Sequence, residues 1–265
     1  MNFFDQLTGR VTESNSLLCV GLDPRGTTVH ELYAECVRTI DATHEFAAAF
    51  KPNSAFFEAF GPDGMRALQE VIAHVPNGIP VILDAKRGDI GDTSVAYAKA
   101  AFDVYKAHAI TVNPYLGKDS VAPFMARADR GAFVLCKTSN PGSDEFQNLE
   151  VRDQTSDVRF QTSERKLFEQ VAYAAQSWNE KNNVGLVVGA TYPESMKHIR
   201  AAAPDLWFLV PGIGAQGGDL EATLRAGLRP DGMGLLINAS RSIVRAKDPA
   251  VEARTLRDAI NQERR

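Results

Sequence analysis

Two carboxylates and a lysine follow a short apolar run and form the most informative group of side chains in the chain. Val81–Leu83 leads directly into Asp84, Lys86 and Asp89, and two glycines then turn the backbone. Charged groups at the carboxyl end of a buried strand cost free energy unless they pair with one another or act on a ligand. The spacing favours a lysine that acts on a ligand. The simpler alternative is an ion pair that closes a loop.

The local backbone pattern predicts how these side chains point. Side chains two positions apart on a strand share a face, so Asp84 and Lys86 are expected to point the same way. Nearby carboxylates favour the charged form of an amine, so Lys86 is expected to stay protonated between Asp84 and Asp89. The helix expected from Ser94 onwards would be capped by Asp92 or Thr93.

The elements that must position this group alternate regularly along the chain. Short, continuously apolar runs predict strands at 17–22, 47–51, 81–85, 109–112, 132–136, 184–188, 207–210 and 234–237. Amphipathic patterns predict helices at 29–43, 63–74, 94–108, 121–130, 165–179, 193–203, 217–226 and 249–263. Eight such units in 265 residues indicate an α/β fold, a single-domain (β/α)8 TIM barrel over residues 1–265. A doubly wound open sheet usually carries GxGxxG after its first strand, and this chain has Asp23-Pro-Arg-Gly26 there.

Composition narrows the function classes. The net charge is −4, and no dense Lys/Arg block points to nucleic-acid binding. No apolar run approaches the ~20 residues of a membrane span, and the first residues lack a signal-peptide pattern. Cys19, Cys36 and Cys136 show no metal-ligand spacing and are expected to be free thiols, with Cys19 and Cys136 buried. We therefore expect a cytoplasmic protein without a metal site.

Polar residues recur where the expected strands end. In a barrel, the carboxyl ends of the strands form the site. The residues expected at this rim are Asp23, Lys51, Asn53, Asp84, Lys86, Asp89, Lys137 to Ser139, Pro211 to Gln216, and Asn238 to Arg241. Taken singly, Asp23 could be a turn residue, Lys51 could extend to solvent, and Gln216 could be an exposed loop side chain.

Two further segments suggest how a ligand would be held. Pro211-Gly-Ile-Gly214 leaves backbone N–H groups free, and Arg241 adds a fixed charge near the last helical region. Barrels often bind phosphate between the loops that follow the seventh and eighth strands. The long polar segment at about 137–164 follows the fifth strand, and we expect this loop insertion to act as a lid.

The strand-end motif Asp84-x-Lys86-x-x-Asp89-Ile90-x-x-Thr93 resembles that of the orotidine 5′-phosphate decarboxylase family. Lys51, the Pro211–Gln216 loop and Arg241 fall in that family's order, and the resemblance spans Leu17 to Ile243. The Asp-Ala-Lys-Arg-Gly-Asp-Ile-Gly form and the long segment after the fifth strand are similar to the longer bacterial subgroup, type 2. Many relatives carry Gly directly before the phosphate-binding Arg, where this chain has Ser240.

The resemblance implies a carboxy-lyase that converts orotidine 5′-phosphate to UMP in pyrimidine biosynthesis without a cofactor. Lys86 would stabilise the carbanion and protonate C6, with Lys51 and Asp84 holding it. Asp89, Ile90 and Thr93 would reach the neighbouring subunit's site in a homodimer. The substrate-binding residues implied are Asp23 for ribose, Ser139 for the pyrimidine edge, Gln216 and Arg241 for phosphate, with Ile90, Thr93 and Pro211.

Three alternatives stay open at this point. A Schiff-base aldolase needs a neutral lysine, and the carboxylates beside Lys86 oppose that. A Mg²⁺-dependent sugar-phosphate relative, such as a keto-gulonate phosphate decarboxylase or hexulose phosphate synthase, would need another carboxylate facing Asp84, for which Glu58 is nearest. A non-catalytic nucleotide-binding barrel would retain Arg241 without the charged group. We assign no histidine to catalysis, expect His108 to be structural, and leave open whether Asn53 or Asn113 contacts substrate.

Overall fold

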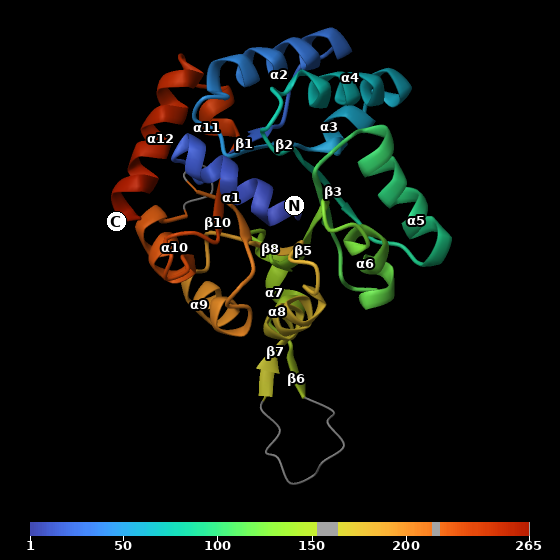
Figure 1. Cartoon of the computed structure of the whole chain (residues 1–265), viewed down its shortest axis with the longest axis vertical. Coiled ribbons are helices and arrows are strands. Elements are labelled where there is room, and N and C mark those ends of the chain that lie inside the picture. The colour runs from blue at the N-terminus through green and yellow to red at the C-terminus, as the bar shows by residue number, and fades with distance from the viewer. Residues whose placement is uncertain (153–163, 214–217, 265) are drawn as a thin grey trace.

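Eight parallel strands form one sheet in the computed structural model, which describes residues 1–152, 164–213 and 218–264 (Figure 1). The strands are β1 (Leu18–Leu22), β2 (Ala49–Pro52), β3 (Ile82–Arg87), β4 (Ala109–Val112), β5 (Gly131–Lys137), β8 (Val184–Val188), β9 (Phe208–Pro211) and β10 (Leu235–Ala239). Their order is β2-β1-β10-β9-β8-β5-β4-β3. Parallel bridges from Phe50 to Val81 and from Asn53 to Asp84 join β2 to β3, so the sheet closes on itself. The expected TIM barrel is confirmed.

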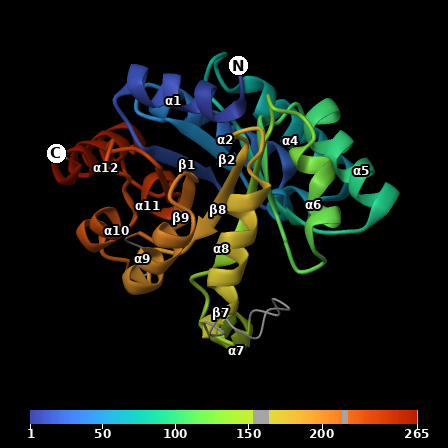
Figure 2. The same cartoon turned by 60° about the horizontal axis from the view of Figure 1, so that its bottom comes forward.

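Helices surround the barrel (Figures 1 and 2). The helices at expected positions are α2 (Val29–Thr43), α4 (Gly61–His74), α5 (Gly91–Lys99), α6 (Lys118–Met125), α8 (Leu167–Trp178), α9 (Pro193–Ala202), α10 (Leu220–Gly227) and α12 (Pro249–Glu263). A π-helical turn, Ala100–Val104, continues α5. Sequence patterns gave the bounds of α2 and α12 correctly because clear caps begin both, a Thr28–Glu31 capping box and an Asp248 cap before Pro249.

Outside the segment after β5, the helices that were not anticipated are α1 (Phe3–Ser14), α3 (Ser54–Glu58) and α11 (Arg241–Val244). In Figure 1, α1 lies across the ring of strands. The backbone N–H of Phe3 donates to the Ala128 carbonyl at 2.9 Å, and the Phe4 ring stacks on Trp207 at 6.1 Å. Because Ala128 precedes β5 and Trp207 precedes β9, α1 closes the amino-terminal end of the barrel with buried aromatic side chains.

The backbone of β3 departs from regular alternation at the charged group. The pairing with β4 shifts register between Leu83 and Arg87, and Lys86 has φ of 46°. The expectation that Asp84 and Lys86 converge by simple strand alternation is therefore incomplete, because a bulge in the strand directs them. The expected cap is wrong: α5 begins after Ile90 without a side-chain cap, and its first residue is a glycine with φ of 51°.

The polar segment after β5 contains several short elements. A 3-10 turn, Pro141–Ser143, leads into α7 (Asp144–Gln147) and β6 (Glu150–Arg152), which pairs antiparallel with β7 (Glu164–Lys166). β6 and β7 extend away from the barrel in Figure 1. Residues 153–163 of the expected lid lie outside the described residues. In the described part of the chain, no helix is long and apolar enough to cross a membrane.

Candidate active site

Asp84 lies at the centre of a hydrogen-bonded cluster at the carboxyl ends of β2, β3 and β4. Its Oδ2 atom accepts a hydrogen bond from Lys51 Nζ at 3.1 Å. Its Oδ1 atom accepts one from Lys86 Nζ at 2.7 Å and one from Thr111 Oγ1 at 2.9 Å. Both carboxylate oxygens are therefore engaged before any ligand is bound, and the sequence-predicted Lys51, Asp84 and Lys86 do come together.

Thr111 also holds the bulge that carries Lys86. Its hydroxyl oxygen accepts the backbone N–H of Ala85 at 3.1 Å and that of Lys86 at 2.9 Å. Lys86 has a left-handed backbone conformation, which a non-glycine residue rarely adopts unless its surroundings impose it. One hydroxyl thus fixes both the carboxylate and the backbone of the lysine. The sequence pattern did not point to Thr111, because a β-branched residue inside an apolar run is first explained as a strand former.

The cluster sets the charge of its two buried ionisable members, Lys51 and Asp84. Burial lowers the pKa of Lys51, but the carboxylates of Asp84 and Asp23 outweigh burial and raise that pKa above its ordinary value. Burial likewise raises the pKa of Asp84, and Lys51 and Lys86 more than reverse this, so its carboxyl stays ionised. Lys51 is only 4% exposed, whereas the side chain of Lys86 is 50% exposed. Lys51 therefore acts as a buried counter-charge, and Lys86 presents its ammonium outward.

Lys86 borders a cavity of about 450 Å³ at this end of the barrel. Lys51, Asp84 and Thr111 line it together with Ser139 and other residues of the segment after β5. A smaller cavity of about 150 Å³ shares Lys51, Asp84 and Pro211 with it and extends to Asp23, Asn53, Asn238, Ser240 and Arg241. The two cavities together form a cleft with the paired charges near its middle.

Three buried oxygen atoms in the smaller cavity lack hydrogen-bond partners within the described chain: Asp23 Oδ1, Asn238 Oδ1 and Ser240 Oγ. Buried polar atoms in native proteins are nearly always satisfied, so an unpaired set in a cavity points to a ligand or bound water. Arg241 lines the same cavity. This end of the cleft can therefore bind a ligand that carries both hydroxyl donors and an anion. Asn238, which the sequence argument mentioned but did not select, belongs to this set.

The serine that replaces the expected glycine fits this backbone. Ser240 has φ of −125°, which does not require glycine. A Cβ atom at Gly21 would lie 2.7 Å from the Cβ of Ser240, so the space for the serine comes from the glycine in β1. The departure from the family pattern at Ser240 is thus accommodated by Gly21, and Arg241 follows at the start of α11.

The segment after β5 is anchored by a lysine that the sequence argument mentioned but did not assign. Lys137 is 1% exposed, and its Nζ donates to Asp144 Oδ1 at 2.6 Å and Asn148 Oδ1 at 3.2 Å. Gln147, between those two partners, exchanges hydrogen bonds with the N–H and hydroxyl of Thr138, both at 2.9 Å. Thr138 and Gln147 line the larger cavity with Ser139, so Lys137 fixes one wall of the cleft.

Several expected site residues lie elsewhere. Asp89, Ile90 and Thr93 do not line the described cleft; Asp89 Oδ1 accepts the N–H of Ile90 at 2.9 Å, and Ile90 is 60% exposed. Gln216 lies outside the described residues. Asn53 lines the smaller cavity, whereas Asn113 accepts the N–H of Tyr115 at 3.0 Å and does not line the cleft.

Other expectations concern metals, thiols and histidine. Glu58 pairs with Arg87 and does not line either cavity, so it does not face Asp84 as a metal ligand would. The three cysteines are free; Cys19 and Cys136 are buried as expected, Cys36 is buried as well, and burial raises the pKa of Cys19 to about 12. His108 has the expected structural role, because its Nδ1 accepts the backbone N–H of Val81 at 3.1 Å.

Comparison with known proteins gives a consistent result. The model of the family "Orotidine 5'-phosphate decarboxylase / HUMPS family" matches residues 16–256. The orotidine 5′-phosphate decarboxylase of Roseiflexus castenholzii is 46% identical, with 98% of each chain covered. Among solved structures, Leishmania donovani OMP decarboxylase is 54% identical with a TM-score of 0.91, covering 100% of this chain and 99% of that one. Leishmania donovani UMP synthase is 57% identical with a TM-score of 0.93, and the chain covers 57% of it.

Proposed function

The chain belongs to the orotidine 5′-phosphate decarboxylase family, and on that premise we propose how its residues carry out the reaction. The chain is a carboxy-lyase that converts orotidine 5′-phosphate to UMP in pyrimidine biosynthesis. The observation that carries the proposal is the placement of the Lys86 ammonium. It is held 2.7 Å from Asp84 at the wall of the cleft and is half exposed to the space where a substrate would lie.

The chemistry requires strong stabilisation of negative charge. The bond between C6 and the carboxylate breaks, CO₂ leaves, and the electron pair stays on an sp² carbon without a conjugated sink. The help required is on the order of 20 kcal/mol, at the upper end of the range for enzymes. Lys86 stabilises the developing carbanion by its charge and then transfers a proton from Nζ to C6. The neutral amine regains a proton from solvent, which closes the cycle.

Asp84, Lys51 and Thr111 prepare this charge in advance. Asp84 accepts hydrogen bonds from both lysines, so the ammonium of Lys86 is oriented before substrate arrives. A charge fixed in a cleft needs no reorganisation at the moment of reaction, and this makes it effective. The carboxylate of Asp84 also lies beside Lys86, where the substrate carboxylate would approach. Repulsion between the two carboxylates raises the energy of the bound substrate and is relieved when CO₂ departs.

The remaining residues bind the substrate. We assign Asp23 to the ribose hydroxyls, Ser139 to the pyrimidine edge, and Gln216 and Arg241 to the phosphate, and we include Pro211 among the substrate-binding residues. Support comes from the cleft itself, since Ser139 lines its larger part and Asp23 and Arg241 line its smaller part, with Pro211 shared. The segment from Lys137 onwards would act as a lid over the base. Binding energy from the phosphate and ribose, remote from C6, would help assemble this arrangement.

We further propose a homodimer in which Asp89, Ile90 and Thr93 complete the partner's site. These residues line neither cavity of the described cleft, and exposed apolar side chains occur in the loop after β3, in α5 and in the loop after β4. Ile90 is 60% exposed, Val95 54% and Tyr115 83%. A Cβ at Gly88 would lie 3.2 Å from the Asn113 backbone oxygen, so the loops after β3 and β4 are neighbours. Light scattering should give twice the chain mass of 28.9 kDa.

Finer assignments follow from the same features. We propose the longer, type 2 subgroup, supported by the extended segment between β5 and α8. A cytoplasmic location is supported by three buried free thiols. A single domain over residues 1–265 is supported by the closed sheet, which runs from β1 to β10, with α1 and α12 packed against it.

The test is turnover of orotidine 5′-phosphate by the purified protein in the presence of EDTA, followed by the change in pyrimidine absorbance. We expect rapid formation of UMP that the chelator leaves unchanged. Turnover that EDTA abolishes would instead favour the metal-dependent sugar-phosphate chemistry of the wider family. That alternative also needs a carboxylate opposite Asp84, and Glu58 is already paired with Arg87.

A further inference from the structure

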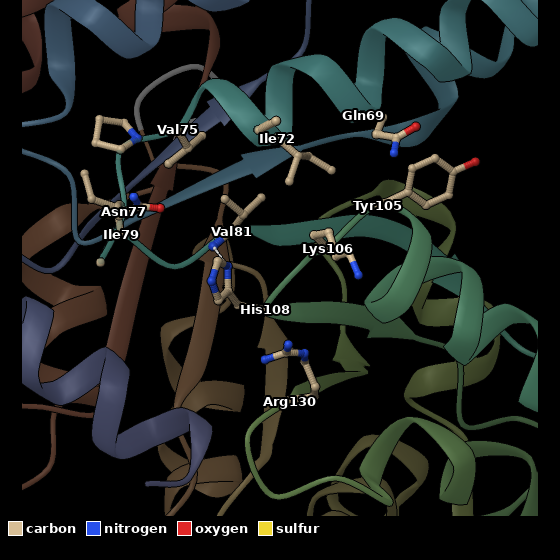
Figure 3. Close-up of a pocket in the computed structure, with 13 residues that line it drawn as sticks. Gln69, Ile72, Val75, Asn77, Ile79, Val81, Tyr105, Lys106, His108 and Arg130 are labelled. Atoms are coloured by element: carbon tan, nitrogen blue, oxygen red, sulfur yellow. Dashed lines mark hydrogen bonds between the residues drawn. The ribbon is translucent and has the colours of Figure 1, made fainter.

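A separate cavity, whose lining residues are drawn in Figure 3, lies at the other end of the barrel from Lys86. Val81 directly precedes β3, His108 directly precedes β4, and Arg130 directly precedes β5. The strands are parallel, so these residues share the amino-terminal rim, whereas Asp84 and Lys86 lie near the carboxyl end of β3. The cavity has a volume of about 390 Å³. This rim of a barrel usually serves stability, so basic groups that gather around a cavity there need a physical explanation.

The cavity has one apolar wall and one basic wall. Ile72, Val75, Ile79, Val81 and Tyr105 supply the apolar surface. Lys106, His108 and Arg130 supply nitrogen donors (Figure 3). No aspartate or glutamate is among the described residues that line it. Next to this wall, the Asp129 carboxylate pairs with Arg130 Nη1 at 3.0 Å.

The donors on the basic wall are incompletely used. His108 Nδ1 accepts the Val81 N–H, so in the neutral ring the proton is on Nε2. Burial and the charge of Arg130 both lower the pKa of His108, which favours that neutral ring. Arg130 Nε is buried and has no acceptor in the described chain. Lys106 is exposed, and within residues 1–152, 164–213 and 218–264 no hydrogen bond or ion pair holds its ammonium.

We propose that this cavity is a second binding site, which takes a small organic oxyanion. The phosphate or carboxylate head lies between Lys106 and Arg130, and the apolar or planar body lies against Ile72, Val75 and Ile79. A buried N–H without an acceptor is unfavourable, and an oxyanion that accepts from Arg130 Nε would remove that cost. Asp129 offsets the charge of Arg130, so Lys106 leaves the cavity net positive. The site uses no residue of the decarboxylation cleft and does not depend on the proposed mechanism.

The experiment is an amide NMR titration with phenyl phosphate, benzoate and inorganic phosphate, run both without UMP and with UMP, which occupies the cleft at the other end. The reporter is the Val81 amide, because its N–H is bonded to His108. We expect saturable shifts at Val81, with phenyl phosphate binding more tightly than inorganic phosphate. Comparison of phenyl phosphate with benzoate identifies the preferred head group. Lys106→Gln and Arg130→Gln should each weaken binding about tenfold, the value of one charge-assisted hydrogen bond.

The matched control is Lys197→Gln, since Lys197 is an exposed lysine on α9 that does not line this cavity. It should bind as the wild type does, and all three variants should retain turnover of orotidine 5′-phosphate. Shifts at Val81 that do not saturate would overturn the proposal. So would equal affinity in the wild type and in Lys106→Gln, which alters an exposed side chain and therefore does not threaten folding. Equal affinity for inorganic and phenyl phosphate would overturn the organic part of the assignment.

Discussion

The two halves of the cleft differ in whether their polar groups are already satisfied. Around Lys86, the oxygens of Asp84 are engaged by two lysines and Thr111 before any ligand binds. Around Arg241, buried oxygens of Asp23, Asn238 and Ser240 have no partner within the described residues. The first half is a set of charges fixed in advance, as catalysis of a charge-forming step requires. The second half gains its hydrogen bonds only when a ligand arrives, as a site that supplies binding energy should.

The largest effect is expected when the ammonium of Lys86 is removed. Lys86→Ala should lower kcat by on the order of 10⁴-fold or more, because both electrostatic stabilisation and proton donation are lost. The effect should fall on kcat rather than on KM. Steady-state kinetics with orotidine 5′-phosphate measures it, and Lys99→Ala on α5, an exposed lysine, serves as the control. A loss of only a few fold would mean that Lys86 is not the group that stabilises the carbanion and donates the proton.

The corresponding change in the other half is Arg241→Gln. Loss of a charge-assisted phosphate contact of about 1.5–3 kcal/mol should lower kcat/KM by roughly 10- to 100-fold. Most of the loss should appear in KM, and saturating substrate should restore much of the rate. Arg66→Gln, at an exposed arginine paired with Asp63, should leave both constants unchanged. A variant with normal KM and a depressed kcat would contradict the division between the two halves.

A smaller effect on kcat tests whether Thr111 positions the catalytic groups or only supports the fold. Thr111→Val removes the hydroxyl that bonds Asp84 and the Lys86 backbone, at about 1 kcal/mol of net hydrogen-bond energy. We expect kcat to fall by about fivefold with little change in KM. Thr111→Ser keeps the hydroxyl and should recover most of the rate. If both variants lose stability equally and neither changes kcat, Thr111 only supports the fold.

The smallest effect near neutral pH concerns stability. The folded pKa of Asp84 is depressed, so its stabilising contribution is present above its unfolded pKa of about 3.9 and is lost as the pH falls below that value. The folded pKa of Lys51 is raised, so its contribution is present below about 10.4 and is lost only at higher pH. Urea unfolding from pH 7 to pH 3 measures the acid limb. The Asp84→Asn variant should have a lower free energy of unfolding than the wild type at pH 7, and that free energy should fall less between pH 7 and pH 3. If the free energy of unfolding falls equally in the variant and the wild type, Asp84 is not the source of the acid limb.

The sequence predicted the fold and some of the residues that line the cleft, and the physical reasons differ. Continuously apolar runs give the eight strands, since a parallel sheet is buried on both faces. Helix α1 was missed although Phe3, Phe4, Leu7 and Val11 have helical spacing and Asn2 and Asp5 form a capping box, so a local signal was present. Thr111 was different: its partner Asp84 is 27 residues away, and their contact depends on a bulge that no local pattern encodes.

The same distinction applies to the remaining site residues. Lys51 and Arg241 were placed correctly in the cleft because strand order determines which ends meet at one rim. The role of Lys137 as an anchor depends on how the chain folds back through Asp144 and Asn148. The absent partners of Asn238 and Ser240 are likewise a property of three-dimensional packing, which the sequence pattern does not express.

The most direct test of the contrast is a calorimetric titration of UMP into the Lys86→Ala variant. UMP carries the ribose and phosphate but no carboxylate, so it reports on the Arg241 half of the cleft. We expect an affinity within a few fold of the wild type, because the groups that lack partners in the described chain are all retained. A loss of affinity as large as that of Arg241→Gln would contradict it, since Lys86 would then contribute mainly to binding.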